Sequence, residues 1–397
     1  MSPVWWDFTL LSLCQPWELT ERFGVQDPRG ERLNRHVALC LAFATGLSLE
    51  VLAVPQAPIR DSPRPRYGAG PPPYTAVEVA FQNAVDNVQL AGTLTVPRGA
   101  LNAPAVLLSQ GLGFEPFDRD YTLPSAPALK SFLAIADALS RNGIVVLRVD
   151  DRGAGRSSGQ KQLSSVQQLA GDLVAGVAFL KTRPEVNPKR IGIIGHSFAG
   201  LTAPIAAVRS NDVAFVITLA GLMTDARVNL ERLPAGLRAV TTATWTTLTQ
   251  SSPTLSSSEL ESRLREAFTL AMANVSDQER APIQSAMAAI VTQWVKWAPL
   301  RRSQAFTDPG EALRALTKPF LAIHGARDRD LDAATNLGPL VRYLGEAANA
   351  DFTVATIPDI DHWMWVCTQP SEPGRPCAEM QFSPKVLDLI TNWIQKH

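Results

Sequence analysis

The chain alternates between short apolar runs and longer amphipathic stretches over most of its length. Continuous apolar runs of strand length occupy 103–111, 144–151, 190–197, 214–221 and 319–325, with a last strand predicted over 351–359. Helical periodicity separates them, for example over 132–143 and 163–180, and an amphipathic helix is predicted over 384–397. Strands that are apolar on both faces and alternate with helices predict an α/β fold with a mostly parallel sheet covered on both sides.

Two segments precede this pattern and one interrupts it. Residues 74–83 and 88–99 alternate apolar and polar positions, which predicts half-buried antiparallel strands. Between Gly221 and Lys318 the strand–helix alternation stops, and helical stretches rich in Ala, Thr, Ser and Leu replace it. Ser258 with Glu261 has the spacing of a helix capping box there. We therefore expect a core of residues 74–221 and 319–397, with a helical cap inserted at 222–318.

The first 54 residues form an N-terminal extension whose pattern predicts a signal peptide. Arg32 and Arg35 precede an apolar stretch over 37–49, and the small residues Ala53 and Ala57 follow it. The alternative is a helix of the mature fold. Residues 55–73 carry seven prolines and predict a semi-rigid linker. The leader pattern predicts a secreted or periplasmic protein.

Charge and cysteine content narrow the class of protein. Lys plus Arg and Asp plus Glu are both 37, and this balance disfavours a nucleic-acid partner. No internal run reaches 18 apolar residues without a charge, so we expect no stable membrane insertion once the leader is removed. Removal of the leader leaves two of the four cysteines, Cys367 and Cys377, ten positions apart. In an oxidising compartment these two can form a disulfide; the alternative is two free thiols.

The strongest chemical signal is Ser197 in the stretch IGIIGHSFAG. It directly follows a buried strand and precedes a helix of small residues, and Gly195, Ala199 and Gly200 leave room for a tight turn. Such a turn exposes a serine hydroxyl at the carboxyl edge of the sheet, in front of a helix N-terminus. The alternative is a structural serine. A hydroxyl is a poor nucleophile alone, so this interpretation requires a base.

Elimination assigns the base among five histidines to His362. His36 lies in the leader and His397 ends the chain, while the side chain of His196 should diverge from the neighbouring serine. His324 ends a strand and is expected to pack locally. His362 follows the last predicted strand, where a general base of near-neutral pKa is needed.

The acid that orients the base should follow a strand and precede His362 in the chain. Asp328, Asp330 and Asp332 meet this condition, and Asp328 is preferred because it lies in the first turn after the strand. Asp361 is too close to His362 to orient its ring. The tetrahedral intermediate needs two backbone donors. The N–H groups of Phe198, after the nucleophile, and Leu112, in the loop after 103–111, are expected to supply them.

These motifs resemble the α/β-hydrolase superfamily, in its serine-hydrolase branch near the serine aminopeptidase-like hydrolases and bacterial esterases. The order Ser197, Asp328, His362 matches that superfamily. Residues 150–159 are similar to its common D-x-R-G-x-G-x-S loop, 111–120 to its oxyanion loop and 308–328 to its return from cap to sheet. The resemblance spans about Tyr74 to His397. Two departures are Gln110, where a histidine is usual before the glycine, and Ala199, where glycine is usual.

The resemblance implies hydrolysis of a small-molecule carboxylic ester through an acyl-enzyme on Ser197, with no metal or organic cofactor. Aromatic residues near the cap and the base suggest an apolar or aromatic ester, although they can equally join cap to core. The residues proposed to line the pocket are Phe114, Trp245, Trp294 and Trp363. Amide or peptide hydrolysis, acyl transfer or thioester cleavage remain alternatives within the fold, and a non-catalytic binding protein is a further one.

Overall fold

The computed structural model describes residues 71–113, 115–123, 126–225, 228, 234–273, 275–369, 377, 379 and 381–397. The predicted signal peptide, most of the proline-rich linker and Phe114 lie outside these residues, so they remain sequence predictions. Among the described residues, no helix combines the length and apolar character needed to cross a membrane.

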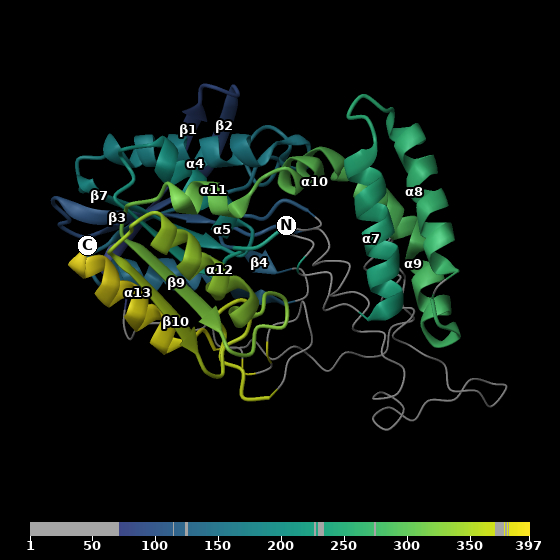
Figure 1. The fold of residues 1–397 in the computed structure, drawn as a ribbon. Helices are drawn as coiled ribbons and strands as arrows, with labels where there is room; N and C mark the ends of the chain where they lie inside the picture. The colour runs from purple at the N-terminus through teal and green to yellow at the C-terminus, as the bar shows by residue number, and fades with distance from the viewer. Residues whose placement is uncertain are drawn as a thin grey trace, which may run out of the picture.

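An eight-stranded sheet forms the centre of the molecule (Figure 1), in the order β1-β2-β6-β3-β7-β8-β9-β10. The β1–β2 and β2–β6 pairs are antiparallel, and all the others are parallel. The strands are β1 (Tyr74–Asn83), β2 (Val88–Pro97), β3 (Ala103–Ser109), β6 (Val145–Val149), β7 (Val186–His196), β8 (Phe215–Leu219), β9 (Phe320–Gly325) and β10 (Phe352–Ile357). A separate hairpin joins β4 (Thr122–Leu123) to β5 (Ala126–Lys130). The sheet confirms the predicted mostly parallel α/β class.

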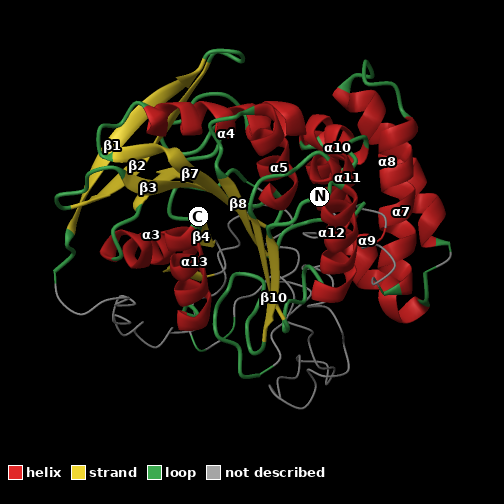
Figure 2. Ribbon diagram, turned by 60° about the vertical axis from the view of Figure 1, so that its left-hand side comes forward, coloured by secondary structure: helices red, strands yellow, loops and turns green. Residues whose placement is uncertain are grey.

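Helices cover both faces of this sheet (Figure 2). Adjacent strand residues belong to different apolar clusters: Leu107 and Ile193 face one side, and Val106 and Ile194 face the other. This alternation explains why the strands read as continuous apolar runs. One face carries α4 (Val166–Lys181), α5 (Ala199–Arg209) and α12 (Ala333–Glu346), and the other carries α3 (Ser131–Arg141) and α13 (Pro384–Lys396).

The cap is a bundle of three helices that stands beside the sheet (Figure 1): α7 (Ala235–Gln250), α8 (Ser257–Met272) and α9 (Asp277–Lys296). The predicted capping box is wrong by two residues. The Ser256 hydroxyl accepts from the Glu259 N–H, and the Glu259 carboxylate accepts from the Ser256 N–H. Three consecutive serines offer three possible caps, and the local pattern alone does not select among them.

The last fifth of the predicted insertion packs against the core, and its helix at 298–305 also contacts the cap helices α7 and α9. Helix α10 (Ala298–Ala305) contacts α4 and the short 3₁₀ helix η1 (Lys161–Leu163), and α11 (Pro309–Arg314) packs against α5 and α12. The segment that stands apart from the sheet is therefore narrower than 222–318.

Candidate active site

Ser197 occupies a tight turn between β7 and α5. Its φ of 55° places a non-glycine residue in the left-handed region, a conformation that costs about 1–3 kcal/mol and is concentrated at functional sites. A Cβ added to Gly195 would lie 2.6 Å from the carbonyl oxygen of Ala199, so no larger residue fits there. The backbone geometry projects the serine at the carboxyl end of β7, at the start of α5.

The structure brings the three predicted residues into direct contact. The His362 ring lies with Nε2 3.0 Å from Ser197 Oγ and with Nδ1 2.9 Å from Asp328 Oδ2. A carboxylate only accepts, so Nδ1 carries the hydrogen and Nε2 of the neutral ring accepts from the hydroxyl. Asp328 and His362 are buried and Ser197 is half-buried, and the residues are 165 and 34 positions apart in sequence.

The preferred aspartate, Asp328, forms a hydrogen bond with the base. Its other oxygen accepts from the N–H groups of Asp330 at 2.9 Å and Leu331 at 2.7 Å, which holds the carboxylate in place. Asp332 instead caps α12, where it accepts from the Thr335 N–H at 2.8 Å. These contacts separate the orienting acid from its neighbours.

The electrostatics of the site favour a charged imidazole. Burial alone would lower the pKa of His362, but the Asp328 carboxylate opposes it most strongly, through its charge and its hydrogen bond, and the pKa rises to about 9. Asp330 and Asp361 act in the same direction through their charges. The protonated ring that forms when a base removes the serine proton is thus stabilised before any reaction begins.

One combination of these side chains also has the spacing of a metal site. Ligand atoms of Asp328, Asp330 and His362 lie within 4.8 Å of one another. Both Asp328 oxygens already accept hydrogen bonds, one of them from the His362 ring. We therefore interpret this set as part of the Ser–His–Asp arrangement.

His196 belongs to a hydrogen-bond chain that the sequence did not reveal. Its Nε2 lies 2.7 Å from the His362 carbonyl oxygen, and its Nδ1 lies 2.9 Å from the Tyr121 hydroxyl. Burial, followed by the charge of His362, lowers the pKa of His196 well below 6.5, so the ring is neutral. Nε2–H therefore donates to the carbonyl and the tyrosine donates to Nδ1. The Tyr121 oxygen in turn accepts from the Gly111 N–H at 3.3 Å.

Gly111 places the loop after β3 directly beside the nucleophile. A Cβ added here would lie 2.9 Å from Ser197 Cβ and 2.6 Å from the Tyr121 hydroxyl. The next residue, Leu112, and Phe198 are both buried, and their N–H groups make no hydrogen bond to the described part of the chain. These two groups are the ones expected to receive an oxyanion. Gln110 anchors this loop, because its side-chain Nε2 donates to the carbonyl oxygens of Asp118 and Val149.

The loop that carries the base is organised by Asp361, a role that the sequence did not indicate. Its carboxylate accepts from the N–H groups of Trp363, Trp365 and Cys377 at 2.8–3.0 Å. Burial raises the pKa of Asp361 to about 7. Cys377 is joined to Cys367 in a disulfide with Cα atoms 5.2 Å apart, which ties the same loop together.

The aromatic residues predicted to line a pocket divide into two groups. Trp363 lies against the base, its ring 5.2 Å from that of His362 and nearly perpendicular to it. Trp245 and Trp294 are buried inside the cap, where their rings meet edge to face at 5.8 Å and join α7 to α9. For this pair the structure favours the second interpretation of the aromatics, in which they hold the cap together.

A known family model described as "Serine aminopeptidase, S33" matches residues 128–366. This range contains Ser197, Asp328 and His362. The chain belongs to this family. The match begins after β3 and ends four residues beyond the base, so it spans the nucleophile turn, the cap and the return to the sheet.

The individual relatives share 25–30% sequence identity with this chain. The chain is 25% identical over 307 residues to "Esterase EstD" of Thermotoga maritima, across 77% of this chain and 66% of that protein. It is 30% identical over 161 residues to "Thiohydrolase aneE" of Aspergillus aculeatus, across 40% of this chain and 46% of the relative. The chain thus spans two thirds or less of these relatives. The solved "Alpha/beta hydrolase GrgF" from Penicillium superposes with a TM-score of 0.50 at 18% identity, over 81% of this chain and 99% of that one. That likeness shows the α/β-hydrolase fold.

Proposed function

We propose that this protein is a serine hydrolase that cleaves carboxylic esters through an acyl-enzyme on Ser197. The observation that carries the proposal is the unbroken contact from the Ser197 hydroxyl through the His362 ring to the Asp328 carboxylate. The strained backbone of the serine and the raised pKa of the histidine support it.

In the proposed reaction, Ser197 Oγ attacks the ester carbonyl while His362 Nε2 takes the hydroxyl proton. The N–H groups of Leu112 and Phe198 receive the developing oxyanion, a contribution of about 3–4 kcal/mol for each donor. The bond to the alcohol breaks as His362 returns the proton to it. Water, deprotonated by the same nitrogen, then attacks the acyl-enzyme; the bond to Ser197 Oγ breaks as His362 returns the proton to that oxygen, and the acid is released. Asp328 keeps the ring in the required tautomer throughout.

The class of ester is proposed on more limited grounds. Trp363 supplies an apolar wall beside the base, which suits a small ester with an apolar or aromatic group. The name of the Thermotoga relative, an esterase, supports oxygen esters. The thiohydrolase relative favours a second candidate, hydrolysis of a thioester by the same residues.

The experiment compares p-nitrophenyl esters of increasing chain length, matching thioesters and aminoacyl anilides. Wild type is assayed beside Ser197→Ala and beside Ser258→Ala, a control serine on the exposed surface of the cap. We expect ester hydrolysis that Ser197→Ala loses and Ser258→Ala retains. Anilide cleavage faster than ester cleavage would replace the substrate class, and full activity in Ser197→Ala would overturn the mechanism.

We also propose that the protein is secreted or periplasmic. The disulfide between Cys367 and Cys377 supports an oxidising compartment, and the basic and apolar pattern of residues 32–53 supports export. N-terminal sequencing of the protein recovered outside the cytoplasm tests this. A start at residue 1 in cell-associated material alone would contradict it.

A further inference from the structure

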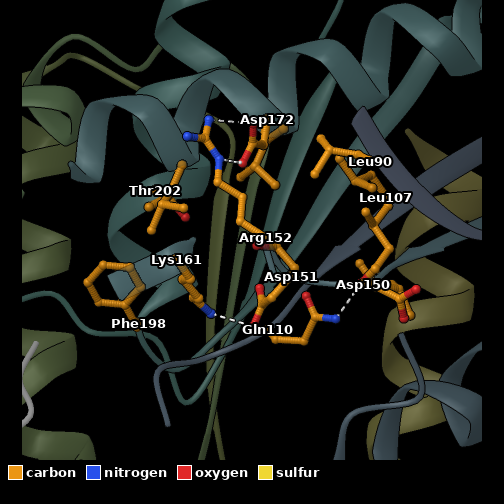
Figure 3. A pocket seen from close by; sticks show the side chains of 15 residues that line it. Leu90, Leu107, Gln110, Asp150, Asp151, Arg152, Lys161, Asp172, Phe198 and Thr202 are labelled. Carbon is orange, nitrogen blue, oxygen red and sulfur yellow. Dashed lines mark hydrogen bonds and ion pairs between the residues drawn. The ribbon is translucent and has the colours of Figure 1, made fainter. Parts of the chain in front are cut away.

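A buried ion pair lies behind the loop that faces Ser197. The ammonium of Lys161 is 2.6 Å from Asp151 Oδ2 and 2.7 Å from the Gly111 carbonyl oxygen. The lysine side chain is 3% exposed and that of the aspartate 12%. Figure 3 shows the pair beside Gln110 and Phe198, where these residues line a small pocket of about 40 Å³. None of the steps proposed above uses this pair.

The second partner of Asp151 is on the same loop. Its Oδ2 also accepts from the Phe117 N–H at 2.8 Å, so the carboxylate holds the returning part of the loop while the lysine holds its start. Burial raises the pKa of Asp151, and the Lys161 charge opposes that rise. A carboxylate or an ammonium this deeply buried is strongly unfavourable without an opposite charge beside it, so the pairing holds both side chains in one position.

Both backbone polar groups of Gly111 form hydrogen bonds with side chains. Its N–H donates to the Tyr121 hydroxyl and its carbonyl accepts from Lys161. The carbonyl of Gly111 and the N–H of Leu112 belong to one planar trans peptide, in which the two groups point in opposite directions. Whatever fixes the carbonyl therefore fixes the direction of the Leu112 N–H. A cation at the carbonyl oxygen also polarises the peptide and makes its N–H a stronger donor.

We propose that Lys161, held by Asp151, is a positioning residue that aims and polarises the Leu112 N–H toward the oxyanion formed on the substrate. The proposal rests on the proposed function, because it assigns Lys161 to the stabilisation of that intermediate. It differs from a packing role because the effect is confined to the tetrahedral state: the planar substrate gains little from a preorganised donor, whereas the oxyanion gains much.

The experiment measures kcat, KM and the affinity for two ketones in Lys161→Met. A trifluoromethyl ketone adds Ser197 Oγ to its carbonyl carbon, the carbonyl becomes an oxyanion, and the serine proton moves to His362. The methyl ketone of the same skeleton stays planar and reports ground-state binding. We expect kcat to fall about 10- to 100-fold, with KM within about threefold. The inhibition constant of the trifluoromethyl ketone should weaken by the same factor as kcat, and that of the methyl ketone should stay within about twofold.

Lys318→Met is the matched control. Lys318 also donates from its ammonium to two backbone carbonyls, those of Ala207 at 2.7 Å and Ser210 at 2.5 Å, but at the far end of α5 from Ser197. This variant should keep the kcat and trifluoromethyl ketone affinity of wild type, even where its stability falls. Lys161→Gln, which retains a donor and loses the charge, provides a second variant and should lie between wild type and Lys161→Met.

Three results would overturn the proposal. They are a wild-type affinity for the trifluoromethyl ketone in folded Lys161→Met or Lys161→Gln, an equal loss of affinity for both ketones, and a failure of both variants to fold. The last two would assign the lysine to structure alone. The proposed function has its own test and is refuted if Ser197→Ala hydrolyses esters as fast as wild type. If Ser197→Ala is inactive while Lys161→Met behaves as wild type, only the role of Lys161 is refuted.

Discussion

Replacing Asp328 by asparagine tests how the base is tuned. The pKa of His362 rises from 6.5 to about 9, and this corresponds to about 3 kcal/mol in favour of the imidazolium. Burial of the ring works against that rise, so Asp328, with the smaller contributions of Asp330 and Asp361, must supply more than the net difference. An amide at the same position removes the charge and no longer demands the Nδ1–H tautomer. We expect the rate at the optimal pH to fall about 10³- to 10⁴-fold.

The pH profile gives the sharper readout. The base acts when neutral, so kcat/KM of wild type should rise with pH, reach half of its maximum near pH 9 and level off above about pH 10. In Asp328→Asn burial dominates, and the same limb should move about two pH units or more toward acid. Asp330→Asn is the control, because its carboxylate also raises the pKa of His362 by charge alone, and it should move the limb less. An unmoved limb in Asp328→Asn, or a larger shift in Asp330→Asn, would refute the assignment of the acid.

The same pair makes a prediction for stability. Because the folded pKa of His362 lies above its ordinary 6.5, the attraction to Asp328 stabilises the fold fully below about pH 6.5. That contribution disappears as the pH rises through about 9. Urea titrations should therefore show a larger difference in unfolding free energy between wild type and Asp328→Asn at pH 6 than at pH 10. An equal difference at both pH values would contradict the pKa argument.

Three other substitutions test neighbouring features. Gly111→Ala would place a Cβ 2.9 Å from Ser197 Cβ, so ester hydrolysis should fall at least about 100-fold with little loss of secondary structure by circular dichroism; activity near wild type would contradict the close approach. Arg152→Met removes the guanidinium that bonds the part-buried carboxylates of Asp86 and Asp172 at 2.5–2.8 Å, so chemical denaturation should show a loss of about 2–3 kcal/mol; a loss below about 1 kcal/mol would contradict a bracing role. Opening the disulfide by replacing both Cys367 and Cys377 with serine should lower stability by about 2–3 kcal/mol, measured the same way, and an unchanged unfolding midpoint would contradict this value.

Much of the fold could be predicted because it depends on local periodicity. The predicted apolar runs coincide with β3, β6, β7, β8 and β9, since each parallel strand buries both faces and leaves an unmistakable pattern. The cap was less well defined. Its helices were expected from composition. The contacts of α10 and α11 with the core arise because the chain passes over the core on its way back to β9, and no local sequence pattern predicts that path.

The sequence alone determined the nucleophile turn and the base, because the turn needs small residues at fixed spacing and elimination leaves one histidine. The sequence already preferred Asp328 to Asp330, but the hydrogen bond between Asp328 and His362, and that between Lys161 and a carbonyl 50 positions away, appear only in the tertiary structure. Only the structure shows that Asp361 accepts backbone hydrogen bonds within the loop that carries the base, and that His196 is hydrogen-bonded to Tyr121. These contacts arise where loops from different strands meet at one edge of the sheet, and their partners are set by loop closure and burial, which no pattern within a single segment encodes.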